Sequence, residues 1–143
     1  MKVEKLPHEL FLKTFEWVPR IAINVHVEDE SGAVLLTQRA IEPKKGSWHY
    51  PGSFLLKNET IQNCIERVVT TELGAEIESG SELLGVFENL DADPRGHVVD
   101  VVYRVKLLGA MHATEETKAL QFFHVLPEDI SFHHDAVLKS LGF

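Results

Sequence analysis

The 143-residue chain has little cysteine, no long apolar run and a deficit of positive charge. Its single cysteine, Cys64, excludes an internal disulfide framework and a four-cysteine zinc site. No stretch approaches the ~18 apolar residues of a membrane-spanning helix, and the segment Met1–Pro7 lacks the apolar core of a signal peptide. We therefore expect a cytoplasmic protein without a membrane partner.

The charge balance bears on the class of ligand. The chain has 14 Lys and Arg residues against 22 Asp and Glu residues, which gives a net charge of -8. Binding to nucleic acids and to anionic membrane surfaces depends on clustered Lys and Arg, so the balance argues against both partners. A nucleotide ligand is not excluded, because it needs only a few local donors, with or without a divalent cation.

An alternating stretch over residues 20–28 predicts a strand. Its odd positions are apolar as far as residue 27, and its even positions include Asn24 and His26. Strict alternation is typical of a half-buried strand. A turn over residues 29–32 and the apolar run over residues 33–38 extend this strand into a hairpin.

Residues 61–73 predict a helix. Apolar residues recur there at helical spacing, Thr60 can cap the N-terminus, and Gly74 suits the left-handed conformation that follows a last turn. Four successive β-branched residues, Val68–Thr71, oppose a helix by propensity. We expect tertiary packing to override that preference, because Gly74 is a better stop than Val68.

The rest of the chain predicts more strands and a C-terminal helix. Strand-like runs cover residues 82–90, 97–108 and 119–125, residues 109–118 form a loop, and Pro127 opens a helical tail that includes residues 136–141. The apolar segment 10–17 is a short helix or strand that covers the core or a partner, and it is compatible with a homodimer. Because no linker or repeat divides the chain, we expect one domain, residues 1–143, of the α+β class, arranged as a sandwich of helices and strands.

Residues 52–74 resemble the Nudix box, G-x5-E-x7-R-E-U-x-E-E-x-G-U, in which U is a bulky apolar residue. Placing the last glycine of the box on Gly74 puts its first glutamate on Glu59, its arginine on Arg67 and its final glutamate on Glu72. The resemblance implies a Nudix-like mixed β-sheet flanked by helices, in an α-β-α sandwich. It also implies a hydrolase that acts on a nucleoside diphosphate linked to another moiety.

Three positions depart from the box. Ser53 stands for the first glycine, Val68 for the glutamate after the arginine, and Thr71 for the first of the paired glutamates. The metal-binding carboxylates of the box lie at i, i+3 and i+4 on one helix face, so only Glu72 remains there. Mg2+ is commonly held by one or two carboxylates together with waters and substrate phosphate oxygens. The Gly52 carbonyl and Glu72 therefore form a candidate site for one Mg2+, with Mn2+ as the alternative.

One branch of the family, the GDP-mannose mannosyl hydrolases, is similar to this chain at residues 67–74 and 19–39. In that branch a single Mg2+ stabilises the departing nucleoside diphosphate while water attacks the sugar carbon. This resemblance implies a nucleotide sugar as substrate, Gly52 and Glu72 as the metal site, and Arg39 as the diphosphate contact.

The general base of that branch is a histidine in the late loop, and it aligns with Thr117. Glu115 or Glu116 beside it can serve as ligand or base, as late-loop glutamates do elsewhere in the family. His112 is a weaker candidate. The arginine that follows the second glycine in that branch is Phe54 here, so one phosphate contact is missing.

Four further residues are candidates for positioning or binding. Glu59 and Arg67 belong to the catalytic set as an expected ion pair that braces the loop against the helix and orients the site. Asn24, on the polar face of the first strand, and Ser53, beside Gly52, are expected to contact the substrate.

Two questions stay open at the level of sequence. The turn Asp93–His97 looks like the Asp-Pro-Arg-Gly-His turn of ADP-ribose-type members, which points to an ADP-ribose pyrophosphatase instead of the mannosyl hydrolase branch. The loss of two carboxylates also keeps a different class open, a Nudix-fold domain that binds a nucleotide as a sensor without turnover.

Overall fold

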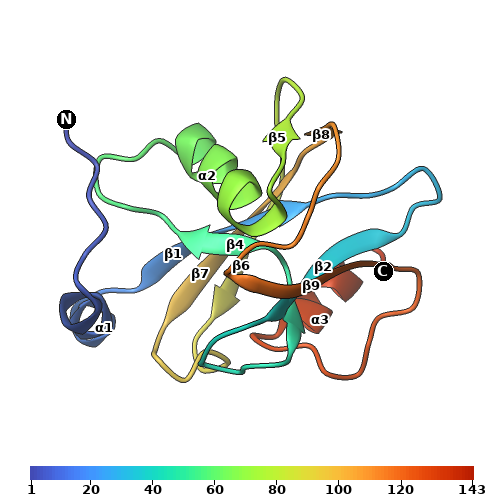
Figure 1. Ribbon diagram of the computed structural model, residues 1–143. Coiled ribbons are helices and arrows are strands. Elements are labelled where there is room, and N and C mark those ends of the chain that lie inside the picture. The colour runs from blue at the N-terminus through green and yellow to red at the C-terminus, as the bar shows by residue number, and fades with distance from the viewer.

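Two β-sheets form the middle layer of the structure, a computed structural model that describes residues 1–143. One face of this layer packs against α2 (Ile61–Leu73) and the other against α3 (His134–Ser140), while α1 (His8–Trp17) lies at one end (Figure 1). This arrangement confirms the predicted α+β class and the α-β-α sandwich. No helix has the length and apolar character that a membrane span requires.

The larger sheet has four strands. In spatial order these are β4 (Gly52–Phe54), β1 (Arg20–His26), β7 (Val98–Arg104) and β6 (Glu82–Asn89). β1 runs parallel to β7 and antiparallel to β4. Ile23 and Val25 pack beneath α2, and Asn24 and His26 are buried on the opposite face. The prediction of a half-buried strand was therefore wrong, because the chain also covers the polar face of β1.

The second sheet pairs β3 (Trp48–His49), β2 (Val34–Arg39) and β9 (Thr117–Phe123), and a small ladder joins β5 (Glu76–Ile77) to β8 (Leu107–Leu108). The hairpin that the sequence predicts is limited to one antiparallel bridge between Glu28 and Val34, with the Leu35 N–H donating to the Val27 carbonyl at 2.9 Å, because β2 otherwise pairs within the second sheet. The strand expected over residues 97–108 is also divided, since β7 ends at Arg104 and β8 turns to pair with β5. The last strand begins two residues before the expected Ala119 and ends two residues before Val125.

The helix α2 has the bounds that the sequence predicts. The Thr60 side chain accepts a hydrogen bond from the Asn63 backbone N–H, and Gly74 ends the helix with a φ of 57°. Val68 and Val69 are fully buried in the core cluster beneath the helix. Burial of these branched side chains explains how packing overrides their weak helix propensity.

The structure resolves the open question at the N-terminus and shortens the helix expected at the C-terminus. The N-terminal segment, for which helix and strand were both open, forms α1. The C-terminal tail is not helical from Pro127, because α3 begins only at His134. Phe132 and His133 have positive φ values of 61° and 55°, so the backbone makes a left-handed turn just before this helix.

Candidate active site

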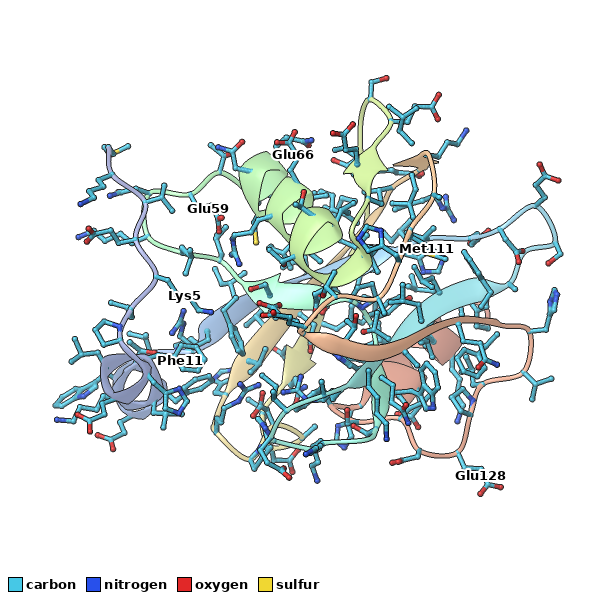
Figure 2. All side chains as sticks on the ribbon, viewed as in Figure 1. Lys5, Phe11, Glu59, Glu66, Met111 and Glu128 are labelled. Carbon is cyan, nitrogen blue, oxygen red and sulfur yellow. The ribbon has the colours of Figure 1, made fainter.

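A cavity of about 410 Å³ brings most of the predicted site residues together. Seven of them line it: Asn24, Arg39, Gly52, Ser53, Arg67, Glu72 and Glu116. Glu59, labelled in Figure 2, lies on the loop that precedes α2 and accepts a hydrogen bond from Arg67. Glu115 is exposed and does not line the cavity. The structure therefore places one of the two late-loop glutamates at the site and not the other.

Glu72 lies in the last turn of α2, where its carboxylate accepts a hydrogen bond from the Gly52 backbone N–H at 2.7 Å. The residue is only 7% exposed. Burial and, after it, the negative charge of Glu116 raise the pKa of Glu72 to about 8, although the Gly52 N–H, Arg39 and Arg67 act in the opposite direction. An ionised Glu72 is therefore costly unless a cation lies beside it.

Gly52 is required by its close approach to β1. A Cβ atom at this position would lie 2.3 Å from Asn24 Oδ1 and 3.0 Å from the Ile23 carbonyl oxygen. Any side chain here would push β4 away from β1. The glycine thus keeps its backbone N–H within reach of Glu72.

The predicted ion pair between Glu59 and Arg67 is present. Arg67 Nε and Nη2 donate to the two Glu59 oxygens at 2.7 and 2.9 Å, and Nη1 donates to Ser53 Oγ at 2.9 Å. The hydrogen bond from Arg67 is the largest cause of a lowered pKa at Glu59. One guanidinium thus holds the loop before α2, the helix and β4 together, which fixes Ser53 and Gly52 relative to Glu72.

The loop over residues 109–116 covers the C-terminal end of α2. The hydroxyls of Thr114 and Thr117 donate to the carbonyls of Thr71 and Glu72, and the His112 N–H donates to the Leu73 carbonyl at 2.8 Å. These bonds satisfy three carbonyls that a helix end leaves without partners. Thr117, which aligns with the histidine base of the mannosyl hydrolases, therefore caps the end of α2 in this protein. The weaker candidate His112 does not line the cavity.

A polar cluster centred on Asp100 forms the floor of the cavity, and no sequence motif points to it. Asn24 Nδ2 and Asn89 Nδ2 donate to the two Asp100 oxygens at 2.8 and 3.3 Å, and His134 Nε2 lies 3.5 Å from Oδ1. Burial alone would raise the pKa of Asp100, but the bonds from His134 and both asparagines outweigh it, and the pKa is lowered. The one sequence signal was a lone acid within the apolar run Val98–Val102.

Arg39, the expected diphosphate contact, has no ionic partner. Its Nε donates to the Pro43 carbonyl, and its guanidinium carbon lies 5.1 Å from the centre of the Phe132 ring. Arg95, in contrast, is held by both oxygens of Asp93 at 2.9 and 2.8 Å. Arg39 therefore keeps a charge that an anionic ligand can use.

The model of the NUDIX domain matches residues 18–139 of this chain. The chain belongs to the Nudix hydrolase family. It is 32% identical over 124 residues to an ADP-ribose pyrophosphatase from Methanocaldococcus jannaschii, a match that covers 85% of this chain and 72% of that protein. A shorter match, 39% identical over 72 residues, covers 50% of the chain and 45% of the low-salt glycan biosynthesis protein Agl8 from Haloferax volcanii.

Solved structures agree with this assignment. A MutT NUDIX hydrolase from Burkholderia pseudomallei is 27% identical to this Nudix chain, with a TM-score of 0.76 over 85% of this chain and 97% of that one. The three helices and the mixed sheet described above are thus those of a Nudix hydrolase.

Nudix hydrolases generally use a divalent metal, and the donors of this chain can be tested against that requirement. The cavity wall offers the Glu72 carboxylate, the Gly52 backbone and the exposed carboxylate of Glu116. No group of three or more His, Cys, Asp or Glu side chains is placed to hold a metal ion. This donor set fits Mg2+, which keeps several waters and takes its remaining ligands from substrate phosphates, and it does not fit a cage built from protein alone.

Proposed function

We propose that this Nudix hydrolase cleaves a nucleoside diphosphate linked to another moiety, a nucleotide sugar of which ADP-ribose is the first candidate, with Mg2+. The observation that carries the proposal is the buried carboxyl group of Glu72 on the wall of a cavity that also holds the unpaired Arg39. A buried carboxyl group with a raised pKa at a cleft is typical of a functional site. A divalent cation and a diphosphate together would compensate both groups.

Each residue has an assigned part in this proposal. Glu72, the Gly52 carbonyl and Glu116 would hold Mg2+, or Mn2+ in its place, and the metal would neutralise charge on the diphosphate. Arg39 binds the diphosphate, and Asn24 and Ser53 contact the rest of the substrate. Glu59 and Arg67 hold Gly52 and Ser53 in position beside Glu72. Glu116, not Glu115, is the late-loop glutamate available as a further ligand or as the base, because only Glu116 lines the cavity.

The relatives support ADP-ribose as the first substrate to assay. One of them is named an ADP-ribose pyrophosphatase, and the turn Asp93–Gly96 places Arg95 and Asp93 at the same cavity. The relative named for glycan biosynthesis supports the inclusion of other nucleotide sugars.

A second candidate function is nucleotide binding without turnover. It is favoured by Val68, which is fully buried in the core, and by Thr71, because neither supplies the carboxylate that the complete Nudix box has on this helix face. Such a protein would keep the cavity and its arginines and lack hydrolysis.

A panel of ADP-ribose, other nucleotide sugars and nucleoside triphosphates, assayed with Mg2+ and analysed by mass, separates these functions. A monophosphate with a sugar phosphate indicates attack at phosphorus, and a nucleoside diphosphate with free sugar indicates attack at carbon. We expect Glu72→Gln to lower kcat/KM about 100-fold or more, and the exposed Glu66→Gln on the same helix to leave it unchanged. Ligand binding without turnover anywhere in the panel would establish the second candidate. Full activity of Glu72→Gln with the same Mg2+ dependence would refute the proposed metal site.

The homodimer and the cytoplasmic location belong to the same proposal. Trp17 and Val18 at the end of α1 are 82% and 52% exposed, and they leave an apolar surface on the N-terminal segment. Sedimentation equilibrium of the full chain tests the dimer, and a purely monomeric protein at micromolar concentration would contradict it.

A further inference from the structure

The cavity has a second end, away from Glu72, where β1 begins. Arg20, Ala22 and Asn24 point from one face of β1 into the cavity. Arg20 and Asn24 are four positions apart along the strand, which is about 13 Å at the usual rise per residue. Because Asn24 lies opposite Gly52 in the sheet, the Arg20 end is distinct from the end that holds Glu72.

Arg20 is buried there without a carboxylate partner. The residue is 9% exposed and forms no ion pair, and its one side-chain hydrogen bond runs from Nη1 to Thr14 Oγ1 of α1. No fully buried side-chain nitrogen or oxygen in the protein lacks a hydrogen-bond partner. The side-chain nitrogens of Arg20 that form no hydrogen bond are therefore not fully buried, and the residue lines the cavity.

Aromatic rings hold this guanidinium in place. Its Cζ atom lies 5.3 Å from the ring centres of both Phe11 and Phe54 and 5.8 Å from that of Phe15. Phe11 belongs to α1, beside the segment that carries Lys5, and both are labelled in Figure 2. Rings at this distance favour a cation but neutralise none of its charge.

The other charged groups at this end do not compensate Arg20. Arg95 approaches the same three rings, with its Cζ 5.2 Å from the Phe54 centre, but Asp93 already binds it through two hydrogen bonds. Lys5 lines the same cavity and adds positive charge. Burial and the neighbouring charge of Arg95 lower the pKa of Arg20, and no acidic group acts in the opposite direction. A buried cation that no carboxylate compensates is costly, and an anion bound beside it would relieve that cost.

We propose that the Arg20 end of the cavity binds a second anionic group of the ligand, a phosphate monoester or a carboxylate, in addition to the diphosphate. Among nucleoside diphosphate derivatives, those that carry a further negative charge are thereby expected to bind more tightly than ADP-ribose itself. This inference rests on the proposed function for the placement of the diphosphate at Arg39 and Glu72. The competing explanation is that Arg20 only anchors α1 to the sheet through its aromatic contacts.

Three pairs of compounds that differ only in one anionic group test the inference. NADPH with NADH, and coenzyme A with its 3'-dephospho form, vary a phosphate monoester, whereas UDP-glucuronate with UDP-glucose varies a carboxylate. Binding of all six to the full chain is measured by calorimetry in EDTA, so that no hydrolysis occurs. We expect the wild type to bind the more anionic member of at least one pair about tenfold more tightly, since charge-assisted bonds to Arg are strong. The pair that shows the preference identifies the phosphate or the carboxylate as the group bound.

Variants then assign the preference to Arg20. Arg20→Gln removes it, and Arg20→Lys, which keeps the charge but not the planar fork, lowers it severalfold. The exposed Arg104→Gln, on the neighbouring strand β7, keeps it in full. Equal loss of affinity for both members of a pair would show that Arg20 is only a structural anchor. If Arg20→Gln does not fold, as judged by its melting temperature, Arg20→Lys decides alone, and an undiminished preference overturns the proposal.

The outcomes for the subsite and for the hydrolase are separable. Absence of any preference in the wild type overturns the anion subsite even if Mg2+-dependent turnover is found. A preference that depends on Arg20 without turnover of any compound keeps the subsite and refutes the hydrolase.

Discussion

The carboxyl group of Glu72 links protonation, metal binding and stability. Its pKa is raised to about 8 in the folded chain, mainly by burial, from an ordinary value of 4.5. Between these two values the folded chain binds more protons than the unfolded chain. The contribution of this group to stability is therefore fully present below pH 4.5 and is lost as the pH rises through about 8. Because a metal binds only the ionised form, Mg2+ stabilises the protein more as the pH rises through the same range.

The pH dependence of stability that Glu72 causes can be measured directly. In EDTA, we expect the free energy of unfolding of the wild type to fall between about pH 5 and about pH 8, and Glu72→Gln to remove the fall attributable to this group. The scale is about 1.4 kcal/mol for each unit of pKa shift. Urea unfolding at four pH values measures it, with Glu66→Gln as the exposed control on the same helix. An identical pH dependence in wild type and Glu72→Gln would mean that Glu72 titrates normally.

The C-terminal end of α2 depends on a hydrogen bond from another element. Thr117 Oγ1 donates to the Glu72 carbonyl at 3.1 Å and accepts from the Thr114 N–H at 3.1 Å, and the residue is 4% exposed. We expect Thr117→Val, which keeps the shape, to cost about 1–3 kcal/mol of stability because two buried polar groups lose their partner. It also loosens the loop that carries Glu116, so the KM for Mg2+ rises.

Urea unfolding and metal titration of activity measure both effects. The same substitution at the exposed Thr70 of α2 serves as control, with a change of less than about 0.5 kcal/mol. If Thr70→Val and Thr117→Val destabilise equally, the late loop is not what stabilises the end of this helix.

Local signals explain which elements the sequence could predict. The bounds of α2 follow from Thr60 and Gly74, which act on neighbouring backbone groups, and the ion pair of Glu59 with Arg67 follows from a motif spacing. The caps from Thr114 and Thr117 join residues 43 and 45 positions apart, and no local pattern specifies such contacts.

The polar floor of the cavity could not be predicted from the sequence either, because its contacts join residues that are far apart in the chain. Asp100 receives hydrogen bonds from Asn24 and Asn89, which lie on two other strands, and it contacts His134 at the start of α3. The helix α3 begins later than the sequence predicts because the backbone is left-handed at Phe132 and His133. Neither residue type favours that conformation, so the sequence gives no signal for it. The sequence likewise shows Arg20 only as the first residue of a strand, since its lack of a counterion depends on the whole cavity.

At the scale of the molecule, two core clusters share the same strands. β1 contributes Ile23 and Val25 to the cluster beneath α2, and its next residue, His26, bonds Tyr50 of the cluster beside α3 at 2.7 Å. In β2, Leu35 belongs to the first cluster and Leu36 to the second. Because neither cluster can lose its strands without exposing the other, we expect residues 1–143 to unfold as one domain.

Unfolding experiments test whether the two core clusters form one cooperative unit. Trp48 packs against Phe123 with ring centres 4.9 Å apart, whereas Trp17 is 82% exposed on α1, so Trp17→Phe leaves a single fluorescent probe inside the second cluster. We expect thermal melts of this variant followed by fluorescence and by far-ultraviolet circular dichroism to coincide. Calorimetry should give one transition with an enthalpy of about 100 kcal/mol near 60 °C, equal to the van't Hoff value, as expected for one cooperative unit of this length. Midpoints separated by several degrees, or a calorimetric enthalpy well above the van't Hoff enthalpy, would show instead that the two clusters unfold as separate units.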